Sequence, residues 1–285
     1  MQVQHHFAHM ASCMADNGLD EPVIGIIWDG TGLGTDKKAW GGEFLCGDFS
    51  GFRRSGSIRP ILLPGGDRAA HEIWRIAAAL LKELPADEDE FLSRHGIPKL
   101  QAETVRRQMG AKINCPETTS IGRLFDGVSA ILGIRETVSY EGQGAILLEA
   151  AASDSCQECY PYRVEDSGDQ EADDLPRYVF DWRPMLEAVL SELQEEKEGV
   201  QRLAAAKFMN TLVQMAAEMA GKISQDTGIR KVVLSGGSFQ NLYVLERLTR
   251  RLKEKGLTAY THSRVSCNDE GLSLGQLMIA RRQLK

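Results

Sequence analysis

Short apolar runs alternate with longer segments of helical periodicity along this chain. The run 23–28 is apolar throughout and indicates a buried strand. Further strands are predicted over 41–46, 51–57, 231–234 and 257–260. Helical periodicity predicts helices over 4–16, 69–84, 87–110 with a polar break near 95–96, 120–132, 144–152, 183–195, 199–227, 241–255 and 272–282. The pattern therefore predicts an α/β fold whose early part is rich in strands.

Two connecting segments have a composition of their own. Asp29-Gly-Thr-Gly-Leu-Gly34 follows the first apolar run and predicts a glycine-rich turn directly after a strand. The segment 165–174 is acidic and poor in apolar residues, which predicts a surface loop. We find no internal repeat and no low-complexity stretch that would suggest a repeat architecture.

Charge and cysteine content narrow the possible classes of protein. The 285 residues include 33 basic and 40 acidic ones, so the net charge is 33 − 40 = −7. A general surface for nucleic acid or anionic membrane is therefore not expected. Six cysteines lie at irregular spacing, and the CxxC of Cys156 and Cys159 has no second pair to complete a structural zinc site. With polar first residues and no spanning apolar run, we expect a cytoplasmic protein.

Histidines gather near the start of the chain. His5 and His9 are four residues apart, so in a helix both imidazoles lie on one face. Two imidazoles so placed form half of a site for a divalent transition metal. The alternative is a polar helix start with surface histidines.

Two aspartates lie beside glycines. Asp29 ends the first predicted strand, where its carboxylate could bind a metal while Gly30, Thr31 and Gly32 let backbone amides approach a phosphate. An Asp-Gly hairpin turn explains the same residues. Asp269 precedes the last helix and is either a metal ligand or a helix cap.

A second glycine-rich segment lies between a predicted strand and a predicted helix. Ser235-Gly236-Gly237-Ser238 leads toward Asn241 at a junction that could hold an anion. It lacks the lysine of a Walker A loop, so alone it is also compatible with an ordinary turn. No GxSxG elbow is present, and no cysteine stands in the context of a nucleophile.

Taken together and in this order, the motifs resemble the carbamoyl-transfer domain of the HypF family of hydrogenase maturation carbamoyltransferases. The segments that match are VQHHFAHMASCMADNG, DGTGLGTDKKAWGGEFLCGDFSGFRR, IRPILLPGGDRAAHEIWR, TSIGRLFDGVSAILG, VSYEGQGAILLE, LSGGSFQN and NDEGLSLGQ. The resemblance implies an α/β fold of the actin/sugar-kinase/Hsp70-like, two-lobed type. Residues 1–60 would be the remainder of a first, incomplete lobe of an N-terminally truncated domain. Residues 61–285 would form the second lobe, with a helical insertion and the nucleotide-binding loop.

The resemblance also implies a set of site residues. The implied metal ligands are His5, His9, Asp29 and Asp269, and the ion would be iron or zinc. The implied nucleotide-binding residues are Gly30, Thr31, Gly32, Gly122, Asp126, Glu141, Gly142, Ser235, Gly236, Gly237, Ser238 and Asn241.

The implied reaction needs two partners. A YrdC-like domain would make carbamoyl adenylate from carbamoyl phosphate and ATP, and this domain would move the carbamoyl group to the C-terminal cysteine thiol of HypE. The thiol would thus come from the partner, which agrees with the lack of a nucleophile motif here. Two other functions stay open: an O-carbamoyltransferase acting on a small-molecule hydroxyl, and an inactive part that only binds HypE and nucleotide.

Overall fold

Eleven α-helices and nine strands are found in the described part of the chain. The computed structural model describes residues 2–168, 175–195 and 197–284. The helices are α1 His5–Asp16, α2 Asp67–His71, α3 Trp74–Lys82, α4 Glu88–Arg94, α5 Lys99–Ala111, α6 Ile121–Ile131, α7 Gln143–Ala151, α8 Arg183–Leu193, α9 Val200–Thr227, α10 Leu242–Glu254 and α11 Leu272–Gln283, with 3₁₀ turns η1 Gly237–Gln240 and η2 Asp269–Gly271. The strands are β1 Val23–Leu33, β2 Ala39–Asp48, β3 Gly51–Ile58, β4 Ile61–Leu62, β5 Glu117–Thr118, β6 Arg163–Asp166, β7 Tyr178–Asp181, β8 Lys231–Ser235 and β9 Thr258–Tyr260.

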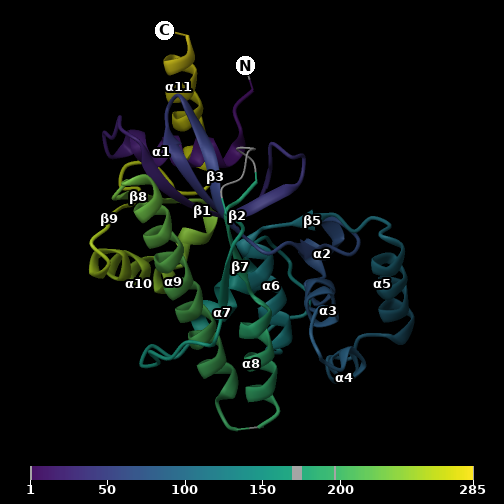
Figure 1. The fold of residues 1–285 in the computed structure, drawn as a ribbon. Coiled ribbons are helices and arrows are strands. Elements are labelled where there is room, and N and C mark those ends of the chain that lie inside the picture. Colours follow the sequence, from purple (N-terminus) through teal and green to yellow (C-terminus); the bar gives the residue numbers. More distant parts are fainter. Residues whose placement is uncertain (1, 169–174, 196, 285) are drawn as a thin grey trace.

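One mixed sheet joins all of these strands (Figure 1). Its main order is β6-β7-β3-β2-β1-β8-β9, and the short β5 pairs with β2 and β4. The first three strands form an antiparallel meander, whereas β8 pairs parallel to β1 and β9 parallel to β8. The α/β class predicted from the sequence is confirmed.

The central strand β1 is buried on both faces of the sheet. Ile24, Ile26 and Trp28 point into the larger hydrophobic cluster, which holds residues of α3, α6, α8, α9 and α10. Val23 and Ile27 point the other way, into a smaller cluster with α1 and α11. This explains why β1 reads as a continuous apolar run rather than as an alternating one. The strand's end is thereby held between two helical layers.

The turn predicted at 29–34 is wrong, because β1 continues to Leu33. Its pairing with β2 shifts register between Trp28 and Gly32 and then resumes with Gly32 opposite Trp40. The hairpin itself follows, closed by the amide of Gly34 donating to the carbonyl of Lys38 at 2.8 Å. Asp29 and its glycines are therefore an irregular stretch within a strand.

The single helix predicted over 69–84 is also wrong in detail. Helix α2 ends at His71 and α3 begins at Trp74, since Glu72 leaves the helical conformation with φ −97° and ψ 72°. The Glu72 carboxylate accepts hydrogen bonds from Arg68 at 2.8 Å and from Arg75 at 2.6 Å. These contacts stabilise the break between the two helices.

The acidic segment 165–174 is only partly a loop. Residues 165 and 166 belong to β6, which pairs antiparallel with β7, while residues 169–174 lie outside the described residues. The strand was missed because its partner lies farther along the chain and supplies the hydrogen bonds that the local sequence does not predict.

The division of the chain at residue 60 stays a prediction. Strands from both proposed ranges join the same sheet, because β1 of the first range pairs with β8 of the second.

In the described ranges, no helix is both long and apolar enough to cross a membrane.

Candidate metal centre

Helix α1 presents two imidazoles to Asp29, in the irregular stretch of the central strand. Gln4 caps the helix by accepting from the amide of Phe7 at 2.7 Å. The ring centroids of His5 and His9 lie 4.9 Å apart, as expected for residues one helical turn apart. His9 is 1% exposed, and its Nε2 atom has no hydrogen-bond partner.

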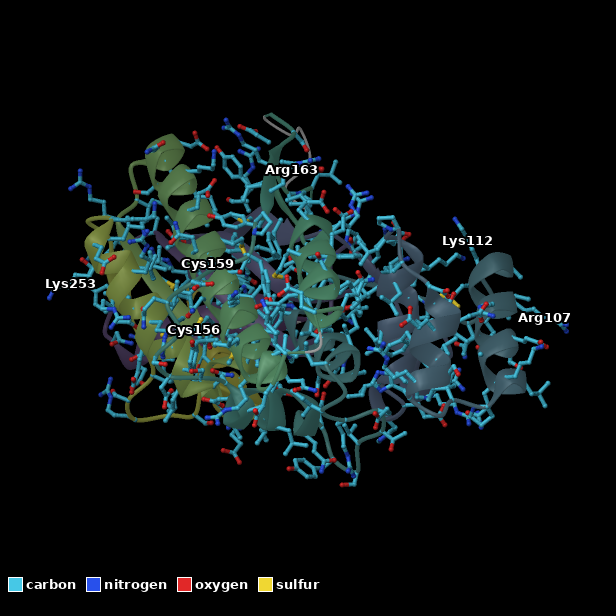
Figure 2. All side chains as sticks on the ribbon, turned by 90° about the horizontal axis from the view of Figure 1, so that it is seen from below. Arg107, Lys112, Cys156, Cys159, Arg163 and Lys253 are labelled. Carbon is cyan, nitrogen blue, oxygen red and sulfur yellow. The ribbon has the colours of Figure 1, made fainter. Side chains whose placement is uncertain are left out.

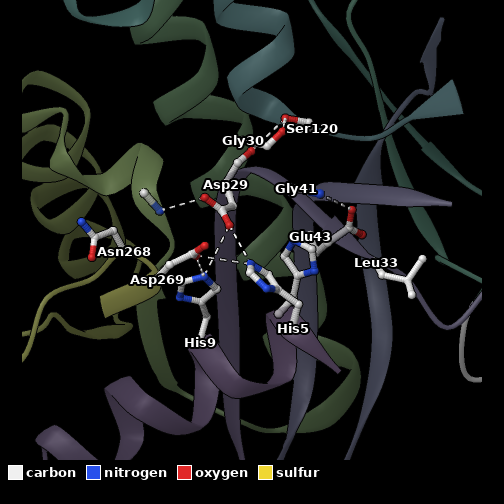
Figure 3. A network of polar contacts seen from close by, with 12 residues as sticks. His5, His9, Asp29, Gly30, Leu33, Gly41, Glu43, Ser120, Asn268 and Asp269 are labelled. Atoms are coloured by element: carbon white, nitrogen blue, oxygen red, sulfur yellow. Dashed lines mark hydrogen bonds and ion pairs between the residues drawn. The ribbon is translucent and has the colours of Figure 1, made fainter. Parts of the chain in front are cut away.

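Two carboxylates meet these imidazoles (Figure 3). Asp29 Oδ2 lies 2.9 Å from His5 Nε2 and 3.4 Å from His9 Nε2. Asp269 Oδ1, on η2, lies 3.5 Å from His5 Nε2 and 3.3 Å from His9 Nε2. One ligand atom from each of the four residues lies within 4.8 Å of every other. All four residues implied by the resemblance are thus brought together.

These donors fit a divalent transition metal. Metal bonds of about 2.1 Å place neighbouring ligands roughly 3.0 to 3.4 Å apart, and the four histidine–carboxylate separations here are 2.9 to 3.5 Å. The buried Nε2 of His9 lacks a hydrogen bond, although buried nitrogen atoms normally have one. A cation bound by this nitrogen and its neighbours would supply the missing partner.

The charges of the cluster support one another. Burial opposes the ionised form of Asp29, but the hydrogen bond with His5 and the nearby imidazole of His9 hold the pKa of that carboxyl well below its usual range. Burial likewise opposes the charged form of His5, yet Asp29 raises the pKa of His5. His6 lies outside the cluster, and burial together with the neighbouring His5 lowers the pKa of His6 to about 3. Asp29 is thus kept in the ionised form that binds metals.

Asp269 is not the cap of its own turn. The side chain of Asn268 caps η2 by accepting from the amide of Glu270 at 3.0 Å. The carboxylate of Asp269 is 70% exposed and faces the two histidines. The helix-capping alternative for Asp269 is therefore wrong.

A clamp that the sequence analysis missed holds the segment that contains Asp269. Asp16, at the end of α1, accepts from the amides of Ser263 at 2.6 Å and Arg264 at 3.1 Å, and from Arg264 Nε at 2.9 Å. Ser12 Oγ donates to the carbonyl of Gly271 at 2.7 Å. The segment 263–271 is thus pinned to the helix that supplies both imidazoles. We call these contacts of Ser12 and Asp16 the α1 clamp.

The α1 clamp follows a spacing that the sequence does contain. His5, His9, Ser12 and Asp16 stand at helical intervals of four, three and four residues, so one face of α1 presents all of them. Close packing completes this face, because a Cβ at Gly275 of α11 would lie only 1.9 Å from the carbonyl oxygen of Ala8. Only a residue without a side chain fits there.

The nucleotide-binding residues predicted near Gly30 also come together. Ser120 Oγ donates to the carbonyl of Asp29, and a Cβ at Gly122 would lie 3.1 Å from the Cα of Gly30. Glu141 also lies close to Gly30, since a Cβ at Gly30 would be 2.8 Å from Glu141 Oε1. Two segments distant in sequence therefore border the irregular stretch of β1 at Asp29 and Gly30.

Arg123 links these segments and was missed from the sequence. Its Nη1 donates to Asp126 and its Nη2 to Glu141, both at 2.8 Å. Burial raises the pKa of Asp126 to about 6, although Arg123 opposes this shift. Gly142 begins α7 in the left-handed conformation, with φ 79°. The segment GRLFD did contain a signal for this pairing. An arginine stands three residues before Asp126, and a buried carboxylate needs a cationic partner.

The glycine-rich segment after β8 lies against Asp29. Gly236 has φ 104°, and a Cβ there would lie 2.2 Å from the carbonyl oxygen of Trp28. The amide of Gly237 donates to Asp29 Oδ1 at 3.2 Å. Asn241 uses its side-chain oxygen to cap α10 by accepting from Val244. The segment is therefore coupled to the candidate metal centre through Asp29.

The remaining predicted residues differ in exposure. Thr31 is exposed on β1, and Ser238 on η1 is half-buried. A Cβ at Gly32 would lie 2.5 Å from His5 Cδ2, so this glycine makes room for the imidazole. Ser235 is fully buried and its hydroxyl pairs with His262 Nε2 at 2.8 Å. Nucleotide binding by these residues stays a prediction.

Comparison with known proteins agrees with this arrangement. Residues 25–276 match the family model described as "Carbamoyltransferase, Kae1-like Domain, second subdomain". The carbamoyltransferase HypF homolog of Cupriavidus necator is 39% identical over 289 residues, covering 99% of this chain and 71% of that protein. This chain belongs to the HypF carbamoyltransferase family.

Two longer HypF proteins extend the comparison. Carbamoyltransferase HypF2 of Cupriavidus necator is 38% identical over 98% of this chain. The crystal structure of full-length HypF "in the phosphate- and nucleotide-bound form" is 39% identical and covers the whole chain with a TM-score of 0.90. In each case this chain spans 36% of the longer protein's length. The family expected from the motifs is thus confirmed.

Proposed function

We propose that this chain transfers a carbamoyl group from carbamoyl adenylate to the C-terminal cysteine thiol of HypE. The main support is the cluster of His5, His9, Asp29 and Asp269, whose ligand atoms lie within 4.8 Å of one another. The cluster borders the glycine-rich segment through the bond from Gly237 to Asp29. A metal site beside a candidate nucleotide loop suits a reaction on an acyl phosphate.

The four ligands would hold divalent iron or zinc. Such an ion, when bound, supplies Lewis acidity toward a carbonyl or phosphate oxygen. Imidazole and carboxylate donors suit either metal. Asp29 has a second duty, because one of its oxygens faces the histidines while the other accepts from Gly237. It would thereby fix the orientation of the glycine-rich segment relative to the cluster.

The AMP part of the substrate would lie between the two glycine-containing regions. Gly30, Gly122 and Glu141 border one side, and the segment 235–241 borders the other. Arg123 would hold Glu141 in place while keeping Asp126 paired. A full-length HypF relative has been crystallised with bound phosphate and nucleotide, which supports a nucleotide site in this family.

The transfer itself needs no nucleophile from this chain. The HypE sulfur, as thiolate, would form a bond to the carbamoyl carbon. The bond between that carbon and the phosphate oxygen would break, and AMP would leave with the electron pair. The thiol proton would pass to solvent. A YrdC-like domain would supply the carbamoyl adenylate.

Intact mass spectrometry of HypE tests this proposal. HypE is incubated with this chain, metal and carbamoyl adenylate, and we expect one added carbamoyl group. The product should be absent with the His5→Ala variant and with HypE whose terminal cysteine is replaced. His71→Ala serves as the matched control, because His71 is exposed and distant from the cluster in sequence.

The other outcomes separate the alternatives. Transfer to a small-molecule hydroxyl with unmodified HypE would establish an O-carbamoyltransferase and refute the thiol acceptor. Nucleotide binding without transfer to either acceptor would contradict the proposed activity and support a part that only binds.

A further inference from the structure

A second group of polar side chains lines a cavity of about 270 Å³ between α9 and α10. Three arginines of α10 line it, namely Arg247, Arg250 and Arg251, together with Cys159. Figure 2 shows Cys159 beside α9 and Lys253 projecting from α10 on the same side of the molecule. None of the lining residues belongs to the candidate metal centre or to the predicted nucleotide-binding residues. We call this cavity the arginine pocket.

The arginine pocket has an uncompensated positive charge. Its lining includes three arginines and a single acidic residue, Glu254, so the local sum is 3 − 1 = +2. The whole chain has a net charge of −7, so this pocket differs in sign from the protein around it. Among the described residues, Arg247 and Arg250 form no ion pair, whereas Arg251 pairs with Glu254 at 2.7 Å. A concentrated positive charge of this kind attracts anions.

Arg247 is held in place before any ligand binds. Its guanidinium carbon lies 3.4 Å from the centre of the Tyr243 ring, and its Nη2 donates to the carbonyl of Asp154 at 3.1 Å. Stacking on an aromatic ring fixes the plane of the guanidinium. Its Nε is buried and has no hydrogen-bond partner. A buried donor without a partner is unfavourable, so an acceptor that reaches this group would be favoured.

The supporting side chains are held as well. Arg251 Nε donates to Gln214 Oε1 at 2.8 Å, which fixes the second arginine against α9. Tyr243 donates from its hydroxyl to Asn210 Oδ1 at 3.1 Å, which fixes the ring beneath Arg247. The cavity therefore combines preorganised donors with one exposed arginine, Arg250. Preorganisation reduces the entropy lost on binding.

We propose that the arginine pocket binds inorganic phosphate as a free dianion. The local charge of +2 is opposite in sign and equal in size to the charge of the phosphate dianion. Guanidinium groups present several N–H donors at once and bind phosphate oxygens in pairs. This inference does not depend on the carbamoyl-transfer proposal, because it uses other residues.

The thiol of Cys159 provides a local test. Cys159 is exposed and lines the pocket, so bound phosphate should hinder its alkylation. The full chain is treated with iodoacetamide at constant ionic strength while phosphate is raised to about 20 mM, a range that detects millimolar affinity. Peptide mass spectrometry then gives the alkylation rate at each cysteine. We expect saturable slowing at Cys159 by about threefold or more, since reactivity follows access and thiolate character.

Internal and matched controls separate this site from general effects. Cys115 is half-buried and does not line the arginine pocket, so its alkylation rate should not respond to phosphate. Arg250→Gln should abolish most of the protection, because Arg250 is exposed and its replacement leaves the helix intact. Arg107→Gln on α5 should keep full protection; Figure 2 shows Arg107 on the opposite side of the molecule from Lys253.

Three results would overturn the proposal. The first is an alkylation rate at Cys159 that does not change with phosphate. The second is equal slowing by acetate at the same ionic strength, which would show attraction of any anion. The third is undiminished protection in both Arg250→Gln and Arg247→Lys, the second variant keeping charge but losing the paired N–H donors.

Discussion

The candidate metal centre and the arginine pocket are two polar sites built on opposite principles. In the cluster, two imidazoles meet two carboxylates at separations of 2.9 to 3.5 Å, so that unlike groups face one another. In the pocket, three arginines of one helix meet a single glutamate. The cluster draws its residues from α1, β1 and η2, whereas the arginines lie within five residues of each other.

The two sites therefore obtain their ligand preference in different ways. The carboxylate of Asp29 is stabilised as an anion by the neighbouring histidines, so removal of one residue should disturb the whole set. The pocket has an excess charge of one sign, so each arginine contributes more independently and salt should weaken it. The predictions below test these two descriptions.

The largest effect is expected for His9→Gln. This change removes a buried candidate ligand, 1% exposed, and should lower the affinity for iron(II) or zinc by more than about 100-fold. Elemental analysis after dialysis measures the bound metal, and thermal unfolding of the metal-free protein checks the fold. Equal metal content in His9→Gln and in the exposed control His71→Gln would show that the cluster is not a metal site.

The next effect in size is expected for Asp126, a buried carboxylate that pairs with one cationic side chain, Arg123. Its pKa is raised from 3.8 to about 6, so the folded protein holds this proton more tightly than the unfolded chain does. The corresponding stability is fully present below about pH 4 and is lost as the pH rises through about 6. The loss is on the order of 2 to 3 kcal/mol.

Comparison with Asp126→Asn isolates this contribution. Urea unfolding at several pH values should show the wild-type free energy of unfolding falling relative to the variant between pH 4 and 6, about the interval set by the shifted pKa. Asp89→Asn, whose side chain is 79% exposed, is the matched control. A difference that does not vary with pH would mean that the pKa of Asp126 is not raised.

A smaller effect on metal binding is expected when the α1 clamp is loosened. Asp16→Asn removes the charge that binds Arg264 and two amides, so Asp269 should be held less firmly. We expect metal affinity to fall about 10-fold, the scale typical of residues behind the ligands. Metal titration compares this variant with Asp269→Asn, which sets the effect of losing the ligand itself.

The control for the clamp is Asp20→Asn. Asp20 is exposed and its closest ion pair is long, 3.9 Å to Arg282. The contrary result is an Asp16→Asn variant that unfolds at lower temperature and still binds metal with the affinity of Asp20→Asn. That result would show that the α1 clamp stabilises the fold and does not support metal binding.

The smallest expected effect concerns the arginine pocket. Here the substitution should strengthen ligand binding, whereas the substitutions at the candidate metal centre should weaken it. Glu254→Gln removes the single acidic residue of the lining and releases Arg251 from its ion pair. Phosphate protection of Cys159 should then reach its half-maximum at a concentration about two- to threefold lower, because one unit of opposing charge is lost. Glu246→Gln, exposed on the same helix, is the control. Weaker protection in Glu254→Gln would contradict the additive charge description.

Some features were accessible from the sequence for plain physical reasons. The spacing of His5 and His9 fixes their common face, since helical geometry is local. The apolar run before Asp29 predicted a buried strand because a strand covered on both faces needs apolar side chains throughout. The family followed from many motifs in one order. In contrast, no local signal in the sequence predicted two distant pairings, Arg123 with Glu141 18 residues away and Asp16 with Ser263 247 residues away.

The sequence by itself determined the α/β class, the helical face of His5 and His9, and the membership of the family. Tertiary structure alone decided that β1 runs on through Asp29 to Leu33, and that Asp269 faces the histidines while Asn268 caps its turn. It alone also decided that three arginines border a cavity against α9. The physical reason is the distance in sequence between the residues that interact. Periodicity and capping depend on residues a few positions apart, whereas these contacts depend on which distant segments the sheet and helices bring together.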